Sequence, residues 1–261
     1  MKMTIKTAGL TVALSAGLLF GVQSQASMYV VPEGLHVSVP YELGPTNPGK
    51  WGDSVPGTPA SVTWSLIPDG TGCGSECSST ISSLASFMPA GFKAEIERAF
   101  NAWESVAGIT FTEVTDSGAP FDSPGATGDI RIGGHGFDGT SGILAHGYYP
   151  PANGISAAGD IHFDTAESWS IGSNIDIFTV ALHEIGHAIG LGHSSNADAV
   201  MYAYYGGPVS GLHQDDIDGA VYLYGQAAPV PVPATIWLML SGLGLLLRFG
   251  KRASSREAVA V

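Results

Sequence analysis

The chain contains little cysteine and few basic residues, and both scarcities limit what it does. Cys73 and Cys77 are the only cysteines among its 261 residues, so their spacing offers no zinc site without other ligands nearby. In an exported protein we expect them to form one small disulfide loop. Residues 27–225 carry 22 acidic but only four basic residues, a net charge of −18. Such a surface does not attract nucleic acid, whereas it suits a protein that collects divalent cations or one that needs solubility.

The chain also lacks an apolar run of the ~20 residues needed to cross a bilayer. At the N-terminus two lysines precede an apolar run over residues 8–22, and the small residues Ser24 and Ala26 follow. This order predicts a secretory signal peptide over residues 1–26, cleaved after Ala26. A membrane anchor is the alternative, but the apolar run is short for one. We therefore expect the protein to leave the cytoplasm.

A second short apolar stretch, residues 235–247, lies between a proline-rich segment and basic residues near the C-terminus. This order resembles the PEP-CTERM sorting tail of Gram-negative bacteria, although Val232 stands where the motif has Glu. The resemblance implies that an exosortase-type enzyme removes the tail, that the tail contacts the membrane transiently, and that the protein lies outside the cell or on its surface. A plain C-terminal anchor is the alternative reading of residues 226–261.

The remaining chain divides into a Pro- and Gly-rich extended segment over residues 27–60 and one domain over residues 61–225. Alternation of apolar residues predicts strands and a 3.6-residue period predicts helices. The expected strands cover 61–68, 109–114, 129–132, 143–148 and 160–163, and the expected helices cover 92–106, 176–190 and 215–224. This order of elements indicates an α/β domain with a mixed sheet.

The run HEIGHAIGLGH, residues 183–193, carries the strongest chemical signal. His183 and His187 are four residues apart in a segment that reads as helical, so both imidazoles project from one face. Gly190 can adopt the backbone conformation that ends a helix and turns the chain, which allows His193 to return to the same point. Three neutral imidazoles are the ligand set of a catalytic zinc, because they leave a fourth position for water.

Glu184 follows the first of these histidines and is expected to stand beside that water. There it can act as general base, taking the proton from the water and passing it to the leaving amine. A helix with surface histidines is the alternative. The glycine and the third histidine at fixed offsets argue against it, because chance rarely produces all of these positions together.

The motif HExxHxxGxxH is the metzincin signature, and its surroundings resemble one branch of that group. Ser194 after the third histidine, and Met201 in AVMYAYYG, resemble the matrixins, in which the methionine forms a turn beneath the zinc. Residues 96–103 and 215–225 resemble the first and last helices of that family. The resemblance covers residues 62–225 and implies a metzincin-like catalytic domain with a twisted five-stranded mixed sheet and three helices.

The same resemblance implies a secreted zinc-dependent endopeptidase that acts on protein or peptide substrates. Ala203 stands where the family usually has proline, so the specificity pocket behind the zinc is expected to differ. Two alternatives are a non-enzymatic metal-binding protein of the extracellular matrix or cell surface, and a zinc hydrolase with another substrate. Glu184 argues against the first, because a structural metal needs no base beside it. No PRCGxPD-like motif occurs, so no cysteine-based latency is expected.

Three further histidines, His135, His146 and His162, lie in segments that resemble the matrixin loops around a structural zinc ion. In that family an aspartate two residues after the first histidine supplies the fourth ligand. Phe137 occupies this position here, which leaves the fourth ligand open. Asp138 moving into the site, or a water molecule, are the two alternatives.

The same loops resemble the calcium site of the family, and hard oxygen ligands in a glycine-rich loop suit Ca²⁺. Ordinary loop polarity is the alternative for these acidic residues. The expected calcium ligands are the carboxylates of Asp138, Asp164 and Glu167 with the backbone carbonyls of Gly139, Ser141 and Ile143.

Overall fold

The computed structural model describes residues 25–29, 49–74, 76–150 and 156–229. The chain divides into two units after Ala227, and nearly all of the second lies outside these residues. The expected signal peptide, apart from Gln25 and Ala26, and the apolar stretch 235–247 also lie outside them. Within the described part of the chain, no helix is long and apolar enough to cross a membrane.

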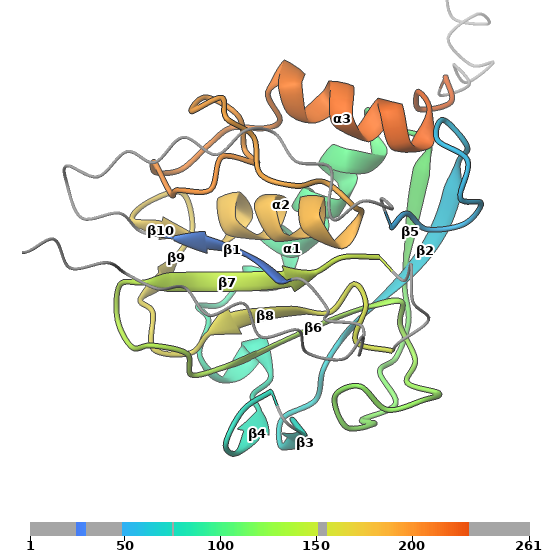
Figure 1. Cartoon of the computed structure of the whole chain (residues 1–261). Helices are drawn as coiled ribbons and strands as arrows, with labels where there is room; N and C mark the ends of the chain where they lie inside the picture. Colours follow the sequence, from blue (N-terminus) through green and yellow to red (C-terminus); the bar gives the residue numbers. More distant parts are fainter. Residues whose placement is uncertain (1–24, 30–48, 75, 151–155, 230–261) are drawn as a thin grey trace, which may run out of the picture. The chain divides into compact units, whose positions relative to one another are not determined.

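The central sheet contains the five strands expected from the sequence and one more. Its strand order is β1-β7-β8-β6-β2-β5 (Figure 1). The strands β5, β2, β6 and β8 pair in parallel, while β7 is antiparallel to β8. The mixed five-stranded sheet is therefore confirmed, and β1 extends it antiparallel to β7. The bounds are Gln25–Tyr29 (β1), Ala60–Leu66 (β2), Ile109–Glu113 (β5), Ile130–His135 (β6), Ile143–Tyr148 (β7) and Ile161–Asp164 (β8).

The three expected helices are α1 (Phe92–Glu104), α2 (Ile177–Ala188) and α3 (Gln214–Tyr224). Every residue of α2 is buried, which is typical of a helix inside the core rather than on its surface. The short elements are β3 (Thr71–Gly72), β4 (Thr80–Ile81), the 3₁₀ turn η1 (Leu84–Ser86), β9 (Trp169–Ser170) and β10 (Ile175–Asp176).

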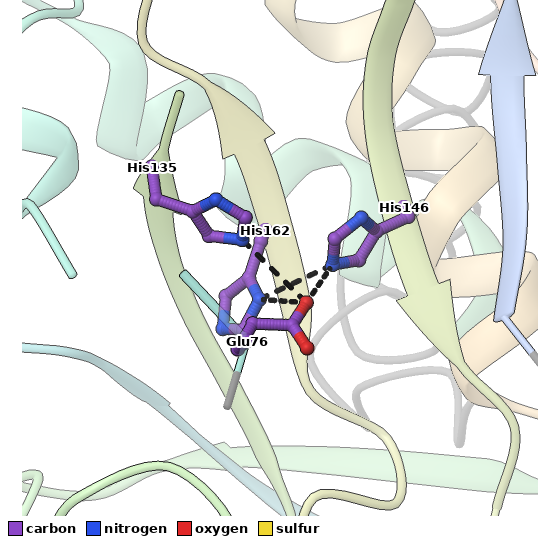
Figure 2. A group of neighbouring side chains, drawn as sticks. All are labelled: Glu76, His135, His146 and His162. Carbon is purple, nitrogen blue, oxygen red and sulfur yellow. Dashed lines mark hydrogen bonds and ion pairs between the residues drawn. The ribbon is translucent and has the colours of Figure 1, made fainter. Parts of the chain in front are cut away.

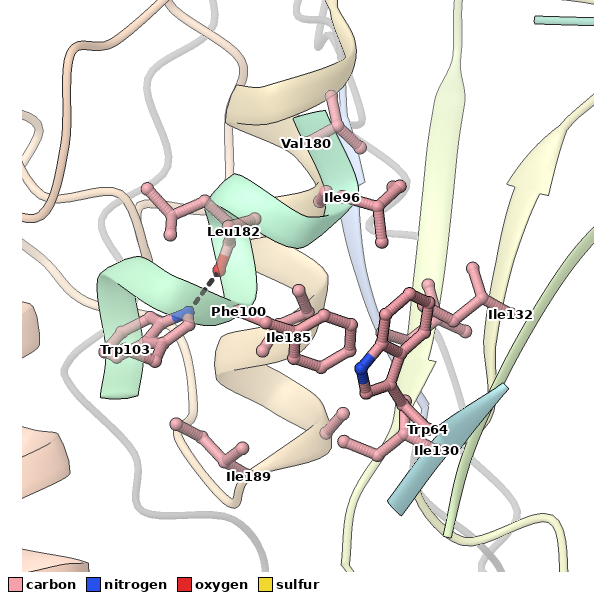
Figure 3. Close-up of a cluster of buried hydrophobic side chains, with 14 of the residues drawn as sticks. Trp64, Ile96, Phe100, Trp103, Ile130, Ile132, Val180, Leu182, Ile185 and Ile189 are labelled. Atoms are coloured by element: carbon pink, nitrogen blue, oxygen red, sulfur yellow. Dashed lines mark hydrogen bonds between the residues drawn. The ribbon is translucent and has the colours of Figure 1, made fainter. Parts of the chain in front are cut away.

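Aromatic residues of α1 join the helices to the sheet (Figure 3). Phe100 stacks on Trp64 of β2 with ring centroids 4.9 Å apart. Trp103 is fully buried and its indole N–H donates to the backbone oxygen of Leu182 in α2 at 3.0 Å. Such a buried indole contributes packing area while its single donor stays satisfied. The α2 helix is therefore held in place by the core as well as by its own hydrogen bonds.

A buried ion pair joins Arg131 of β6 to Asp116, which follows β5. Arg131 of β6 makes a two-pronged contact with Asp116, with Nε and a terminal nitrogen each 2.8 Å from one carboxylate oxygen. Their side chains are 0% and 2% exposed. Burial alone would raise the pKa of Asp116, but the hydrogen bonds from Arg131, Gly118 and Ser65 outweigh it and lower that pKa. The pair is therefore ionised at neutral pH.

Candidate metal centres

The positions of His183 and His187 depend on where the α2 helix begins and ends. Its N-cap Asp176 accepts hydrogen bonds from the backbone N–H and the hydroxyl of Thr179 at 3.0 and 2.7 Å, which satisfies the first turn. Gly190 ends the helical region with φ +108°, as expected from the sequence. A β-carbon there would lie 2.3 Å from the backbone oxygen of Gly49, so only glycine fits.

The ring nitrogens of the three histidines converge. Nδ1 of His183 is 2.7 Å from the carbonyl of Val200, and Nδ1 of His187 is 2.7 Å from that of Leu191. Because a carbonyl only accepts, both rings carry their proton on Nδ1 and direct the Nε2 lone pair inward. Nε2 of His187 lies 2.9 Å from Nε2 of His183 and 3.2 Å from Nε2 of His193. Lone pairs facing one another in this way favour a cation between them.

These spacings are close to, and slightly shorter than, those of nitrogens around a zinc ion. Zinc–nitrogen distances of about 2.0–2.1 Å in a tetrahedron place the nitrogens about 3.3–3.4 Å apart. Burial, with the nearby His193, lowers the pKa of His183 to about 3, and burial likewise moves the pKa of His187 well below its usual value. Both rings are therefore neutral at neutral pH, which is the form that binds a metal.

The chain after α2 carries the third histidine, His193, and then packs Met201 against α2. The N–H of Ser194 donates to the carbonyl of Met201 at 2.8 Å, and the carboxylate of Asp216 accepts from the N–H of Met201 at 3.0 Å. A β-carbon on Gly186 would lie 2.2 Å from the sulfur of Met201. Met201 therefore packs directly against α2 between the histidines, where the family resemblance predicts it.

The side chain of Glu184, a residue of α2, faces β7. This side chain is fully buried, and neither carboxylate oxygen makes a well-formed hydrogen bond among the described residues, although the backbone of Met28 lies close enough to act on it. Burial raises its pKa well above the usual value, and the backbone of Met28 partly opposes that rise. The two elements approach closely here, because a β-carbon on Gly147 would lie 2.9 Å from the backbone oxygen of Glu184. A buried carboxyl with a raised pKa is suited to accepting a proton.

The strand β1 lies along the edge of this site. It pairs antiparallel to β7, with Met28 opposite Ala145, and Met28 is 3% exposed. The sequence predicted only an extended segment over residues 27–60, without a place for it. The structure shows that part of this segment runs as a strand beside Glu184.

The second group of histidines includes a residue that the sequence analysis missed. His135, His146 and His162 meet at the carboxylate of Glu76 (Figure 2). Oε1 of Glu76 is 2.8 Å from Nε2 of His146 and 3.5 Å from both Nε2 of His135 and Nδ1 of His162. Nε2 of His146 is 3.2 Å from Nδ1 of His162. The four ligand atoms therefore have the spacing of one metal site.

The structure places Glu76, and not Asp138, beside these three histidines. Asp138 does not move in, since it is exposed and its carboxylate lies 3.3 Å from the N–H of Ile143. Phe137, at the position of the family's aspartate, stacks on His146 with ring centroids 4.7 Å apart. The sequence signal for Glu76 is its place between two cysteines, but nothing local brings it near histidines 59 or more residues away.

The expected calcium ligands come near one another without forming a compact group. Oε1 of Glu167 accepts from the N–H of Ser141 at 2.6 Å. One oxygen each of Asp164 and Glu167 is buried without a hydrogen bond among the described residues. Burial raises the pKa of Glu167, and repulsion from Asp164 and Asp138 adds to the rise. In the described chain, however, only the two histidine groups gather three or more His, Cys, Asp or Glu side chains whose ligand atoms lie within 4.8 Å of one another. The backbone of Gly139, one of the expected carbonyl ligands, has φ +93°, in the left-handed region that favours glycine.

Comparison with known proteins identifies the family. Residues 79–225 match the Matrixin family model, which is more than half of the chain. Karilysin from Tannerella forsythia is 41% identical over 150 residues, covering 54% of this chain and 30% of karilysin. Human matrix metalloproteinase-25 is 43% identical over 151 residues (51% and 25%), and rat stromelysin-2 is 42% identical over 153 residues (53% and 30%). The chain thus spans less than a third of each relative's length. It belongs to the matrixin family of zinc metallopeptidases.

Proposed function

We propose that this chain is an exported, zinc-dependent endopeptidase that hydrolyses peptide bonds, with His183, His187 and His193 as zinc ligands and Glu184 as general base. The observation that carries the proposal is the convergence of three imidazole nitrogens on the helix that also carries the fully buried carboxyl of Glu184. A merely structural metal would not require that carboxyl.

The residues of the chain have distinct tasks in this reaction. Zinc at the site would polarise the substrate carbonyl and lower the pKa of water to about 7. Glu184 accepts the proton of the attacking water and donates it to the leaving amine. The carbonyls of Val200 and Leu191 fix the tautomers of His183 and His187, so that their Nε2 lone pairs stay directed inward. Burial of the glutamate strengthens each of these interactions.

Replacing His193 by alanine is expected to remove the catalytic zinc, because two ligands on one helix do not close the site. Metal analysis after dialysis should show one zinc fewer per chain, and cleavage of an unfolded protein substrate should fall with it. His213→Asn is the matched control. His213 caps α3 outside both metal groups, and asparagine preserves a cap. An unchanged zinc content in His193→Ala would place the third ligand elsewhere.

The position of β1 supports a proposal for how a peptide substrate binds. An extended chain running antiparallel to β7 places its backbone beside Glu184, as Met28 does here. Such strand addition uses the free hydrogen-bonding groups of a sheet edge. A substrate that takes this path must displace β1, of which residues 27–29 remain after cleavage at Ala26, so we propose that this remaining segment competes with the substrate.

A proline at position 28 should therefore raise activity. Met28→Pro disfavours the extended strand pairing of β1 and also removes the backbone N–H that faces Glu184, whereas Met28→Leu retains both the N–H and an apolar side chain. Each 1.4 kcal/mol of lost pairing corresponds to about a tenfold gain in kcat/KM on a short peptide, as long as β1 blocks most molecules. If the proline variant keeps its melting temperature and shows no gain over the leucine variant, β1 does not compete.

We further propose that the second histidine group holds a structural zinc ion and that the loops containing Asp138, Asp164 and Glu167 bind calcium. The buried oxygens of Asp164 and Glu167 that lack hydrogen bonds among the described residues support a cation there. Calcium that binds only the folded protein adds about 2.7 kcal/mol at a hundredfold excess over its dissociation constant. The melting temperature should be higher with calcium than with a calcium-selective chelator. An identical melting temperature under both conditions would contradict the proposed calcium site.

Export and sorting are proposed from the two ends of the chain. The signal peptide would be removed after Ala26, inside β1, and the tail within residues 226–261 would be removed or retained at the surface of a Gram-negative cell. Mass spectrometry of the exported protein tests both ends. Peptides from residues 253–261 on the mature protein would show that the tail stays attached.

A further inference from the structure

Glu76 contacts the second histidine group, although it lies in a segment that the sequence did not connect with these histidines. It lies in the loop between Cys73 and Cys77, outside the residues 79–225 that match the family. Its side chain is 10% exposed, and Oε1 faces all three histidines at 2.8–3.5 Å. This carboxylate is therefore a feature of the chain that the family match does not cover.

The disulfide loop is fixed to the core at one end. Cys73 is 1% exposed and packs with Ile67 and Ile81, and it is bonded to Cys77. The N–H of Glu76 donates to the carbonyl of Cys73 at 2.9 Å. The crosslink returns the chain to Cys73 directly after Glu76, so the glutamate is held on both sides. Closing a loop in this way removes alternative conformations that the open chain would sample.

The surroundings of Glu76 divide the roles of its two oxygens. The hydroxyl of Tyr148 donates to Oε2 at 2.5 Å, which leaves Oε1 directed at the histidines. The ring of Phe121 packs against both Tyr148 and His162, with centroids 5.5 Å apart in each case. A carboxylate oriented by a second hydrogen bond within an aromatic shell is typical of a metal ligand with its supporting partner.

We propose that Glu76 is the fourth ligand of the second metal ion, and that the Cys73–Cys77 disulfide holds it in the site, so that retention of this metal depends on the crosslink. The proposal rests on the second zinc site proposed above. Three imidazoles and one carboxylate complete a four-coordinate shell without water, as in a structural zinc site. When the crosslink is lost, Glu76 is free to leave and the metal keeps only its three histidines.

The test compares zinc retention in five proteins: the wild type, Glu76→Gln, the double variant Cys73→Ala/Cys77→Ala, the combination of these two, and the control Glu113→Gln. Glu113 is exposed at the end of β5 and forms a surface ion pair with Lys93. Each protein is dialysed against chelators of graded strength, and zinc per chain and melting temperature are measured. We expect two zinc ions in the wild type and the control. We expect at least about tenfold weaker retention of one ion in Glu76→Gln, since even supporting residues of metal sites contribute 10–100-fold.

The cysteine variant should lose the same ion, and combining it with Glu76→Gln should cause no further loss. Wild-type retention in Glu76→Gln would overturn the ligand assignment. Wild-type retention in the cysteine variant alone would overturn the role of the disulfide. A wild-type protein with a single zinc, lost in His193→Ala, would instead remove the second site itself.

A second measurement covers the case in which the cysteine variant does not fold. The wild-type protein is reduced with a phosphine, which gains an oxygen atom from water as the disulfide becomes two thiols. Zinc retention should fall on reduction and recover when the disulfide is formed again by air oxidation. Glu76→Gln, already lacking the ligand, should not respond. Equal retention before and after reduction of the wild type would overturn the dependence on the crosslink.

Discussion

Replacing Glu184 by glutamine is expected to lower peptide hydrolysis by about 10²–10⁴-fold, which is the usual contribution of a general base. The fold should remain intact, because glutamine has nearly the same volume and its amide oxygen can still accept from the backbone N–H of Met28. The zinc content should also stay unchanged, since the ligands are the three histidines.

The measurement is kcat/KM on a short peptide, with zinc content and melting temperature recorded on the same preparations. Glu113→Gln is the control for removing an acidic side chain, because this glutamate lies on the surface in a pair with Lys93. A Glu184→Gln variant that cleaves at a rate close to wild type would show that another group takes the proton.

Replacing Arg131 by methionine is expected to destabilise the fold by about 3–5 kcal/mol, because it leaves the buried carboxylate of Asp116 without its ionic partner. Lys93→Met removes two surface ion pairs, with Glu97 and Glu113, of a side chain that is 43% exposed, and it should cost no more than about 1 kcal/mol. Urea denaturation of both variants gives the comparison. A loss below 1 kcal/mol in Arg131→Met would mean that the pair contributes no more than a surface pair.

The pH dependence of this pair has a definite sign. Because the folded-state pKa of Asp116 is lowered, its stabilisation is present above about pH 4, the ordinary value for aspartate, and is lost as the pH falls further. The difference in unfolding free energy between wild type and Arg131→Met should therefore shrink in strong acid. Replacing Asp116 by leucine as well should recover part of the loss at neutral pH, since both charges are then absent.

The sequence was sufficient for features set by local patterns. The apolar period between Phe92 and Val106 predicted α1, and the fixed offsets within residues 183–193 predicted which imidazoles come together. The turn at Gly190 followed from the requirement for a positive φ. In each case the residues that determine the structure are neighbours along the chain, so their spacing alone carries the information.

Features that depend on distant contacts were not accessible in this way. Glu76 contacts three histidines that lie in three separate strands, β6, β7 and β8. The sequence around Glu76 has no periodicity that would predict these contacts. The pairing of β1 with β7 likewise joins segments more than 100 residues apart. Tertiary packing decides both, because the same short polar or apolar stretch fits many places in a fold.

Zinc dependence of peptide cleavage tests the central claim most directly. The protein is stripped of metal with a chelator, zinc is returned in measured amounts, and cleavage of one unstructured peptide is followed in the wild type and in Glu184→Gln. We expect no cleavage without metal, recovery with zinc in the wild type, and almost none in the variant although it binds zinc equally. Cleavage at the full rate by metal-free protein, or equal recovery in both proteins, would contradict a zinc- and glutamate-dependent peptidase.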